Sequence, residues 1–259
     1  MAPKTKTKKS SGGGGAAATS VAPPGAAFQY YVEKSPNVQY ASSFLAPEIP
    51  IYAAQPTLDT LYDGTIQRLR FFMTKTECED AMALADRIGF THVFHPQTSE
   101  YAHRDNDRLL LKSPDLAAQL WHRLQPFLPS SLDLAGAVGC NPAIKFYRYR
   151  TNQSFGCHVD ESVVDPDTKL VSRYTLLVYL NDASDSALQG GATQFYACTS
   201  SRSKKRKKNG NDSAPVLSVE PQTGMVLMHG HGEHCLEHEG ATVLRGAKYV
   251  LRTDVMFDR

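Results

Sequence analysis

Two segments in the first half of the chain carry the hydrophobic spacing of amphipathic helices. In the first, Thr74 and Glu77 form a capping-box pattern, and Gly89 stands where a helix ends. The apolar residues between them share one helical face: Cys78, Ala81, Leu84, Ala85 and Ile88. In the second, Ser113 is a suitable N-cap and Pro114 fits the first helical position. Its apolar stripe is Leu116, Ala117, Leu120, Trp121 and Leu124. The pattern predicts two helices.

From about residue 143 the pattern changes to short strands. The segments are rich in β-branched and aromatic residues and are separated by turn residues. They are AIKFYRYR, SRYTLLVYLND, GGATQFYACT, GMVLMHGH and AKYVLRTDVMF. Helices followed by strands predict an α+β fold, with the helices packed on an all-β core.

The remaining segments set the domain boundaries. Residues 1–26 are Lys, Ser, Gly, Ala and Pro, which cannot bury enough apolar surface to fold, so we expect a disordered tail. Residues 27–259 then form a single domain, with 27–65 as an irregular lead-in. The stretch 200–214 interrupts the strands and is too charged for a core. We expect an exposed basic loop there.

Composition narrows the class of protein. The chain has 28 basic and 26 acidic side chains, so nucleic-acid binding would need a local patch. KKRKK at 204–208 is of the nuclear-localisation type, and a solvated loop explains it equally well. No apolar run approaches the ~18 residues of a transmembrane helix, and the N-terminus lacks the apolar region of a secretory signal. Five cysteines without a CxxC pair favour reduced thiols in the cytoplasm or nucleus.

The strongest chemical signal lies in the strand half. His158 and Asp160 stand at i and i+2, so on a strand both side chains point to one side. Downstream, the segment HGHGEHCLEHEG holds four histidines: His229, His231, His234 and His238. Two imidazoles and one carboxylate on a metal form the facial triad of non-haem Fe(II) oxygenases. His-x-Asp alone is weak evidence, and a solvated histidine beside a turn carboxylate is the alternative.

Two cations strengthen the metal interpretation. Lys248 and Arg252 share one face of the last predicted strand, with Val250 between them. A cation among apolar residues needs an anionic partner, because an unpaired buried charge is costly. A dicarboxylate co-substrate on the metal would supply that partner.

From about Phe71 to Phe257 the sequence resembles the 2-oxoglutarate- and Fe(II)-dependent dioxygenase superfamily, and within it the prolyl 4-hydroxylase-like catalytic domain. The resemblance is sharpest where several motifs follow one another in order: KFYRYRTNQSFGCHVDES, TLLVYLND, GGATQFY, VEPQTGMVLMHGH and LEHEGATVLRGAKYVLRTDVMF. It implies a double-stranded β-helix, or jelly roll, with the N-terminal helices packed on one sheet.

The resemblance also implies roles for individual residues. His158, Asp160 and His238 would be the catalytic metal ligands. Lys248, ten positions after His238, would bind the outer carboxylate of 2-oxoglutarate, with Arg252 as a second candidate. Tyr149, and more weakly Tyr147, would line the co-substrate pocket.

Several alternatives stay open at this level. His231 and His234 compete with His238, which is preferred because the downstream Val243, Gly246 and Lys248 are in register with it. A zinc site from Cys235 with His231 or His234 lacks the usual spacing and a fourth ligand. The segment His103–Arg108 is either a polar loop or part of the active-site mouth. In the second case Arg104, Asn106 and Arg108 would contact substrate.

The expected activity is hydroxylation of an unactivated C–H bond with Fe(II), 2-oxoglutarate and O2, releasing succinate and CO2. Ascorbate is the expected helper that keeps the iron reduced. We expect a protein or peptide substrate, of the kind that prolyl hydroxylases use, and no membrane or nucleic-acid partner. The alternatives are the same chemistry on a small molecule or a nucleic-acid base, and a catalytically silent jelly roll that acts as an interaction module.

Overall fold

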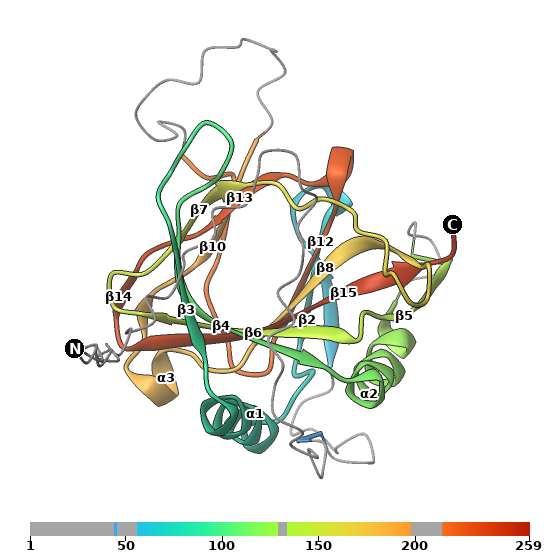
Figure 1. Cartoon of the computed structure of the whole chain (residues 1–259), viewed down its shortest axis with the longest axis horizontal. Helices are drawn as coiled ribbons and strands as arrows, with labels where there is room; N and C mark the ends of the chain where they lie inside the picture. The colour runs from blue at the N-terminus through green and yellow to red at the C-terminus, as the bar shows by residue number, and fades with distance from the viewer. Residues whose placement is uncertain (1–43, 46–55, 129–133, 198–213) are drawn as a thin grey trace, which may run out of the picture. The chain divides into compact units, whose positions relative to one another are not determined.

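The computed structural model describes residues 44–45, 56–128, 134–197 and 214–259. The expected tail 1–26 and nearly all of the expected basic loop 200–214, including KKRKK, lie outside the described residues. Within the described part, the antiparallel sheet is strongly curved, and the two longer helices lie on its outside (Figure 1).

Both predicted helices are confirmed. α1 spans Lys75–Ile88 and α2 spans Pro114–Leu124. The capping box is complete, because Thr74 Oγ1 accepts from the Glu77 amide and the Glu77 carboxylate accepts from the Thr74 amide. The described residues also contain four shorter helical turns, which are η1 (Tyr62–Gly64), η2 (Gln125–Phe127), α3 (Ala183–Ser186) and η3 (Gly232–His234).

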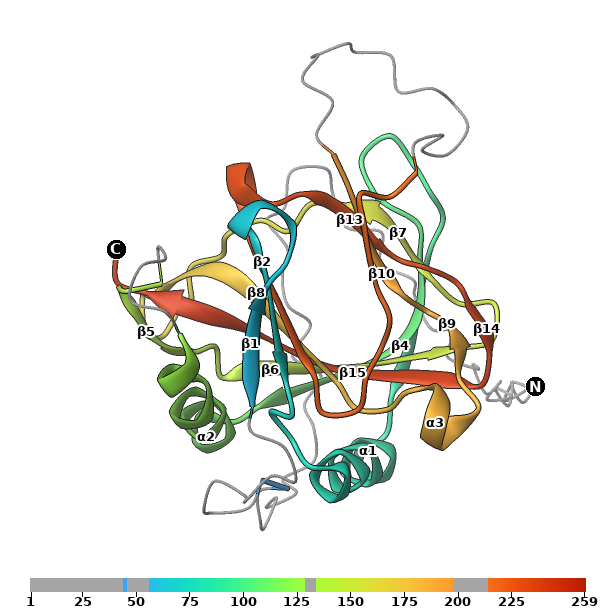
Figure 2. The same cartoon turned by 180° about the vertical axis from the view of Figure 1, so that it is seen from behind.

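In the part of the chain that the structure describes, thirteen strands form the main sheet, and two more form a separate small sheet. The main path runs β1-β2-β12-β8-β15-β6-β4-β7-β13-β10-β11, with β3 on β4 and β5 on β15; β14 pairs with β9. Figure 2 shows the same strands from behind. In chain order they are β1 (Thr57–Thr60), β2 (Ile66–Arg70), β3 (Thr91–His95), β4 (Arg104–Lys112), β5 (Ala137–Cys140), β6 (Ala143–Arg150), β7 (Phe155–His158), β8 (Val171–Tyr179), β9 (Gln189–Gly190), β10 (Thr193–Tyr196), β11 (Leu217–Val219), β12 (Val226–Gly230), β13 (Glu237–Gly240), β14 (Val243–Arg245) and β15 (Ala247–Phe257).

Strand alternation separates the interior into two apolar clusters. On β6, Ile144 and Phe146 join the cluster that holds the buried faces of α1 and α2. Tyr147 and Tyr149, on the opposite face, join the second cluster together with Val250 of β15. The helices therefore cover one side of the sheet, and the other side carries the second buried cluster. This is the expected jelly-roll core with helices packed on one sheet.

The expected order, helices first and strands afterwards, is wrong in detail. β1 to β4 precede α2, and β1 lies inside the stretch that we expected to be irregular. The polar segment Arg104–Arg108 is not a loop but the first half of β4. Its charges fit a strand because Asp107 pairs with Arg148 on the neighbouring β6, with Oδ2 2.8 Å from Nη2.

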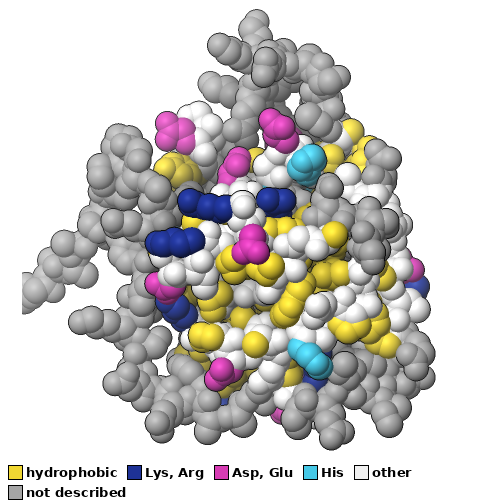
Figure 3. Space-filling model, turned by 90° about the vertical axis from the view of Figure 1, so that its right-hand side faces the viewer, with side chains coloured by type: hydrophobic (Ala, Val, Ile, Leu, Met, Phe, Trp, Pro, Cys, Tyr) yellow, Lys and Arg dark blue, Asp and Glu magenta, His cyan; other side chains and the backbone are white. Residues whose placement is uncertain are grey.

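The surface carries mixed charge. On the face shown in Figure 3, basic and acidic side chains are interspersed around exposed hydrophobic ones. Within the described residues, no helix combines the length and apolar character that crossing a membrane requires.

Candidate metal centre

Three side chains from the second half of the chain meet where β7 pairs with β13. His158 ends β7, Asp160 follows it by two residues, and His238 lies on β13 directly opposite His158. Nε2 of His158 is 3.8 Å from Asp160 Oδ1, and Nε2 of His238 is 3.7 Å from Asp160 Oδ2. The structure therefore brings together the three residues that the sequence pattern proposes as ligands, with donor atoms from all three within 4.8 Å of one another.

Backbone carbonyls orient both imidazole rings. Nδ1 of His158 donates to the carbonyl of Gly156 at 2.8 Å, and Nδ1 of His238 donates to the carbonyl of Leu236 at 2.9 Å. A carbonyl can only accept, so in each neutral ring the proton is on Nδ1 and the lone pair is on Nε2. Both lone pairs are then available beside the Asp160 carboxylate. Carbonyl partners of this kind are typical of metal-binding histidines.

The protonation states also suit a cation. Burial, with His238 adding to it, lowers the pKa of His158 to about 3, so this ring is neutral at physiological pH. Burial alone would raise the pKa of Asp160, but Arg252 and the three nearby histidines hold it well below its usual range. Metal binding requires neutral imidazole and ionised carboxylate, and the site has both before any metal arrives.

A third imidazole, His229, reaches the same carboxylate. It lies on β12, where every residue is buried, and its ring centroid is 4.4 Å from that of His238. Its Nε2 is 3.8 Å from Asp160 Oδ2 and has no hydrogen-bond partner among the described residues, although the side chain is only 2% exposed. His229 had no role among the sequence-based expectations. The available signal was its position two residues after Leu227, because residues two apart on a strand share one face and Leu227 is buried in the interior.

The two competing histidines lie elsewhere. His231 is buried behind Asp160, where its Nε2 bonds Thr175 Oγ1 at 2.8 Å. That hydroxyl in turn donates to Asp160 Oδ2 at 2.7 Å. His231 thus supports the carboxylate through Thr175, whereas His234 is exposed in η3.

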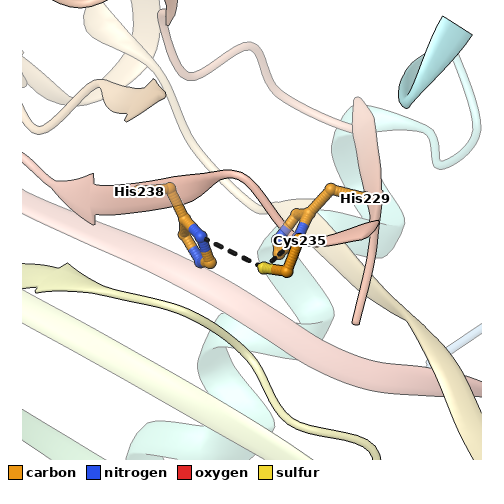
Figure 4. Close-up of side chains that lie close together, drawn as sticks. All are labelled: His229, Cys235 and His238. Atoms are coloured by element: carbon orange, nitrogen blue, oxygen red, sulfur yellow. Dashed lines mark hydrogen bonds between the residues drawn. The ribbon is translucent and has the colours of Figure 1, made fainter. Parts of the chain in front are cut away.

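Cys235 approaches the centre from the other edge of the His238 ring. Its Sγ is 3.7 Å from His238 Nδ1 and 4.0 Å from His229 Nδ1 (Figure 4). The amide of Asp160 donates to this sulfur at 3.2 Å. The structure therefore groups Cys235 with His229 and His238, not with the His231 or His234 that the sequence suggested.

The two cations of β15 differ in their surroundings. Arg252 donates to Asp160 Oδ1 at 3.1 Å and lies 3.4 Å from Asp254 Oδ1, so it is paired inside the protein. Lys248 is 4% exposed, and its Nζ donates to the carbonyl of Gly191 at 2.6 Å. Among the described residues no carboxylate lies within ion-pairing distance of Lys248, and burial lowers its pKa to about 8. Of the two cations on β15, Lys248 is the one without an ion pair among the described residues.

Two tyrosines of β6 lie close to these cations. Tyr149 pairs with Lys248 across the sheet, and Nζ is 5.6 Å from its ring centroid. Burial raises the pKa of Tyr149 to about 12. Burial would also raise the pKa of Tyr147, but Lys145, Arg108, Arg252 and Arg104 outweigh it and lower that pKa to about 8.

Two arginines at the polar start of β4 contact aromatic rings near the metal centre. The guanidinium of Arg104 lies 3.8 Å above the ring of Phe155, and that ring stacks on His158 at 3.7 Å. Arg108 lies 5.7 Å from the ring of Tyr147. Asn106 is fully buried, and its amide oxygen and nitrogen have no hydrogen-bond partner among the described residues. Arg104 reaches the metal centre through Phe155, and its Nε is likewise unpartnered among these residues.

Comparison with family models gives a match within the strand-rich half of the chain. Residues 144–253 match the model of the 2OG-Fe(II) oxygenase superfamily, a match that includes His158, Asp160, His238, Lys248 and Arg252. A search of curated proteins found no match.

Several solved structures are similar to this chain at low identity. A viral collagen prolyl hydroxylase from Paramecium bursaria Chlorella virus-1 is 16% identical with a TM-score of 0.49, covering 75% of this chain and 97% of its own. A Pseudomonas putida prolyl-4-hydroxylase is 14% identical with a TM-score of 0.47, covering 75% and 94%. A Trichoplax adhaerens prolyl hydroxylase, solved with a peptide of the hypoxia inducible factor, is 13% identical with a TM-score of 0.49, covering 75% and 84%.

Proposed function

Because residues 144–253 place this chain in the 2OG-Fe(II) oxygenase superfamily, making it a dioxygenase-type oxidoreductase, we propose that His158, Asp160 and His238 hold its Fe(II). The observation that carries the proposal is the convergence of two Nε2 lone pairs on one buried carboxylate. Two neutral imidazoles and one carboxylate leave coordination positions open, as non-haem iron oxygenases require.

When bound, Fe(II) supplies with 2-oxoglutarate and O2 the oxidising chemistry that hydroxylates an unactivated C–H bond and yields succinate and CO2. The protein contributes geometry and a dry site. Asp160 and His238 are buried, and Arg252 and Thr175 both fix the carboxylate by charge-assisted hydrogen bonds. Ascorbate is the proposed accessory reductant.

Lys248 is the proposed anchor for the outer carboxylate of 2-oxoglutarate. It is a buried cation without a carboxylate partner among the described residues, held in place by Gly191 and by the rings of Tyr149 and Tyr179. An incoming carboxylate would convert an unfavourable buried charge into a charge-assisted pair. Arg252 is already committed to Asp160 and Asp254, so its proposed role is to position the metal-binding carboxylate.

A protein or peptide side chain is the proposed substrate. The order of motifs from the His-x-Asp pair to Lys248 resembles the prolyl 4-hydroxylase-like domain and supports this class. Exposed hydrophobic residues close to the centre support it as well: Val159 lies between two proposed ligands and is 46% exposed. Phe94, 58% exposed, packs edge-on against His103 next to the start of β4. Such side chains suit contact with a polypeptide.

A small anionic molecule is the second proposed substrate class. Arg104 and Arg108 contact aromatic rings and no carboxylate among the described residues. The amide of Asn106 has both of its polar atoms unpartnered. Buried polar groups without partners are costly, and a ligand that bonded them would remove that cost.

For localisation we propose the cytoplasm or nucleus, on the basic runs in the sequence.

Product analysis tests the activity. Metal-free protein reconstituted with Fe(II) and 2-oxoglutarate should form succinate, and His158→Ala should form none while keeping the wild-type circular dichroism spectrum. Substrates are then sought by mass spectrometry, comparing proline-containing peptides with the same peptides carrying alanine, and with dicarboxylates. Succinate formation by His158→Ala equal to wild type would remove the proposed ligand set.

A further inference from the structure

Cys235 lies between two imidazoles in a way that the proposed oxygenase chemistry does not use. Figure 4 shows its sulfur between the rings of His229 and His238, which come from β12 and β13. The sulfur faces Nδ1 of each ring, whereas the proposed iron ligands face Asp160 through Nε2. The two edges of the His238 ring therefore belong to two different groups of donors.

The distances match a tetrahedral metal site. Zn–S bonds of about 2.3 Å and Zn–N bonds of about 2.0 Å at tetrahedral angles place sulfur and nitrogen about 3.5 Å apart. Sγ of Cys235 lies 3.7 Å from His238 Nδ1 and 4.0 Å from His229 Nδ1. Donor atoms of all three residues lie within 4.8 Å of one another. Small side-chain movements would close the gap.

We propose that His229, Cys235 and His238 form a second metal site, which takes a thiophilic ion such as Zn²⁺ and overlaps the proposed iron site at His238. Thiolate and imidazole ligands select zinc and related soft ions, whereas the carboxylate-containing set suits harder ions. Water completes the fourth position. That this second site competes with iron rests on the proposed function; that it binds a thiophilic ion does not.

The sulfur accepts a hydrogen bond from the backbone amide of Asp160 at 3.2 Å, but burial raises the pKa of the Cys235 thiol to about 12, so the thiolate forms only when a metal displaces the proton. Binding forms a metal–sulfur bond and breaks the S–H bond, and the proton leaves to solvent. Neither the metal nor the sulfur changes oxidation state.

His238 makes the two sites mutually exclusive. A neutral imidazole has one lone pair, and the Nδ1–H bond to the carbonyl of Leu236 leaves that lone pair on Nε2, facing Asp160. To bind an ion beside Cys235, His238 must release Leu236 and move its proton to Nε2. An ion at the second site therefore removes one ligand from the first, and a thiophilic metal acts as an inhibitor.

Cobalt(II) spectroscopy tests the second site directly. Metal-free full-length protein is titrated with Co²⁺ in the absence of 2-oxoglutarate, and the thiolate-to-cobalt charge-transfer absorption is recorded. We expect the band in wild type and in His158→Ala, which lacks a ligand of the proposed iron site only. We expect no band in Cys235→Ser. Cys157→Ser is the matched control: its sulfur belongs to neither site, and the band should persist.

Affinity for Zn²⁺ provides the second readout. Competition with a chromophoric chelator should show Cys235→Ser and His229→Gln weakened by more than about tenfold, since loss of even an outer-shell partner costs about 10–100-fold. Should Cys235→Ser fail to fold by circular dichroism, His229→Gln carries the test alone.

Two results would overturn the proposal. One is stoichiometric cobalt binding by wild type without a thiolate band. The other is a band that survives Cys235→Ser or, with unchanged affinity, His229→Gln. Failure of the proposed function would appear separately, as an absence of succinate formation with Fe(II), and leaves the cobalt result interpretable.

Discussion

Replacing Lys248 with methionine tests the proposed co-substrate anchor. Methionine keeps an unbranched apolar stem between Tyr149 and Tyr179 and removes only the ammonium group. The variant should therefore fold. Because burial lowers the pKa of Lys248 to about 8, the metal-free fold bears a cost for this charge, and the variant should be no less stable than wild type.

The magnitude follows from burial. Lys248 is 4% exposed, so a carboxylate bound to it would be withdrawn from water. Truncating one partner of a buried, hydrogen-bonded charge pair costs about 2–5 kcal/mol. At about 1.4 kcal/mol for each factor of ten, the KM for 2-oxoglutarate should rise roughly 30-fold to a few thousand-fold.

The assay is succinate formation against 2-oxoglutarate concentration, with Fe(II) saturating, followed by the converse titration of iron. Lys248→Met should shift the first curve and leave the second nearly unchanged. Arg252→Gln is the matched comparison: it removes a bond to Asp160 and should weaken iron binding more than 2-oxoglutarate binding. If Arg252→Gln raises the KM for 2-oxoglutarate and Lys248→Met does not, the anchor is Arg252 and the reasoning from unpaired charge is wrong.

Two further predictions concern stability and ionisation. Glu77→Gln should lower the free energy of unfolding by about 3–5 kcal/mol in denaturant titrations. The reason is that the substitution removes the carboxylate that lies 2.6 Å from the buried guanidinium of Arg123. An equal effect of the exposed Glu79→Gln would contradict this. A spectrophotometric titration of metal-free protein should show one tyrosine ionising near pH 8 in wild type and not in Tyr147→Phe. Since folding lowers this pKa from an ordinary value of about 10, the associated stability is complete above pH ~10 and is lost as the pH falls through 8. Absence of any step below pH ~9.5 would refute the charge balance around Tyr147.

Local signals explain which elements were predictable. α1 and α2 carry their caps within a few residues, and β6, β8 and β15 carry dense β-branched and aromatic residues. β4 was missed because Arg104 and Arg108 lie against aromatic rings, while Asp107 bonds Arg148 of β6 and Asp105 bonds Gln153 in the turn after β6. Both faces are polar for reasons that only the folded sheet supplies, so the alternation had no apolar side.

In the metal centre, too, some residues could be predicted from local sequence patterns and others could not. Spacing alone brings His158 and Asp160 together, and the motif register singles out His238 among four histidines. The approach of His229 and Cys235 depends on how β12 and β13 meet across the short turn at η3. No local pattern specifies that approach, so the grouping of Cys235 with His229 and His238 becomes visible only in the folded structure.

An anaerobic titration tests the central claim most directly. Fe(II) and then 2-oxoglutarate are added to the metal-free protein, and the visible iron-to-ketoacid charge-transfer band is recorded for wild type and His238→Ala. The account predicts a band in wild type, with one iron per chain, and none in the variant. An absence of the band in folded, iron-loaded wild-type protein, or an undiminished band in His238→Ala, would contradict it.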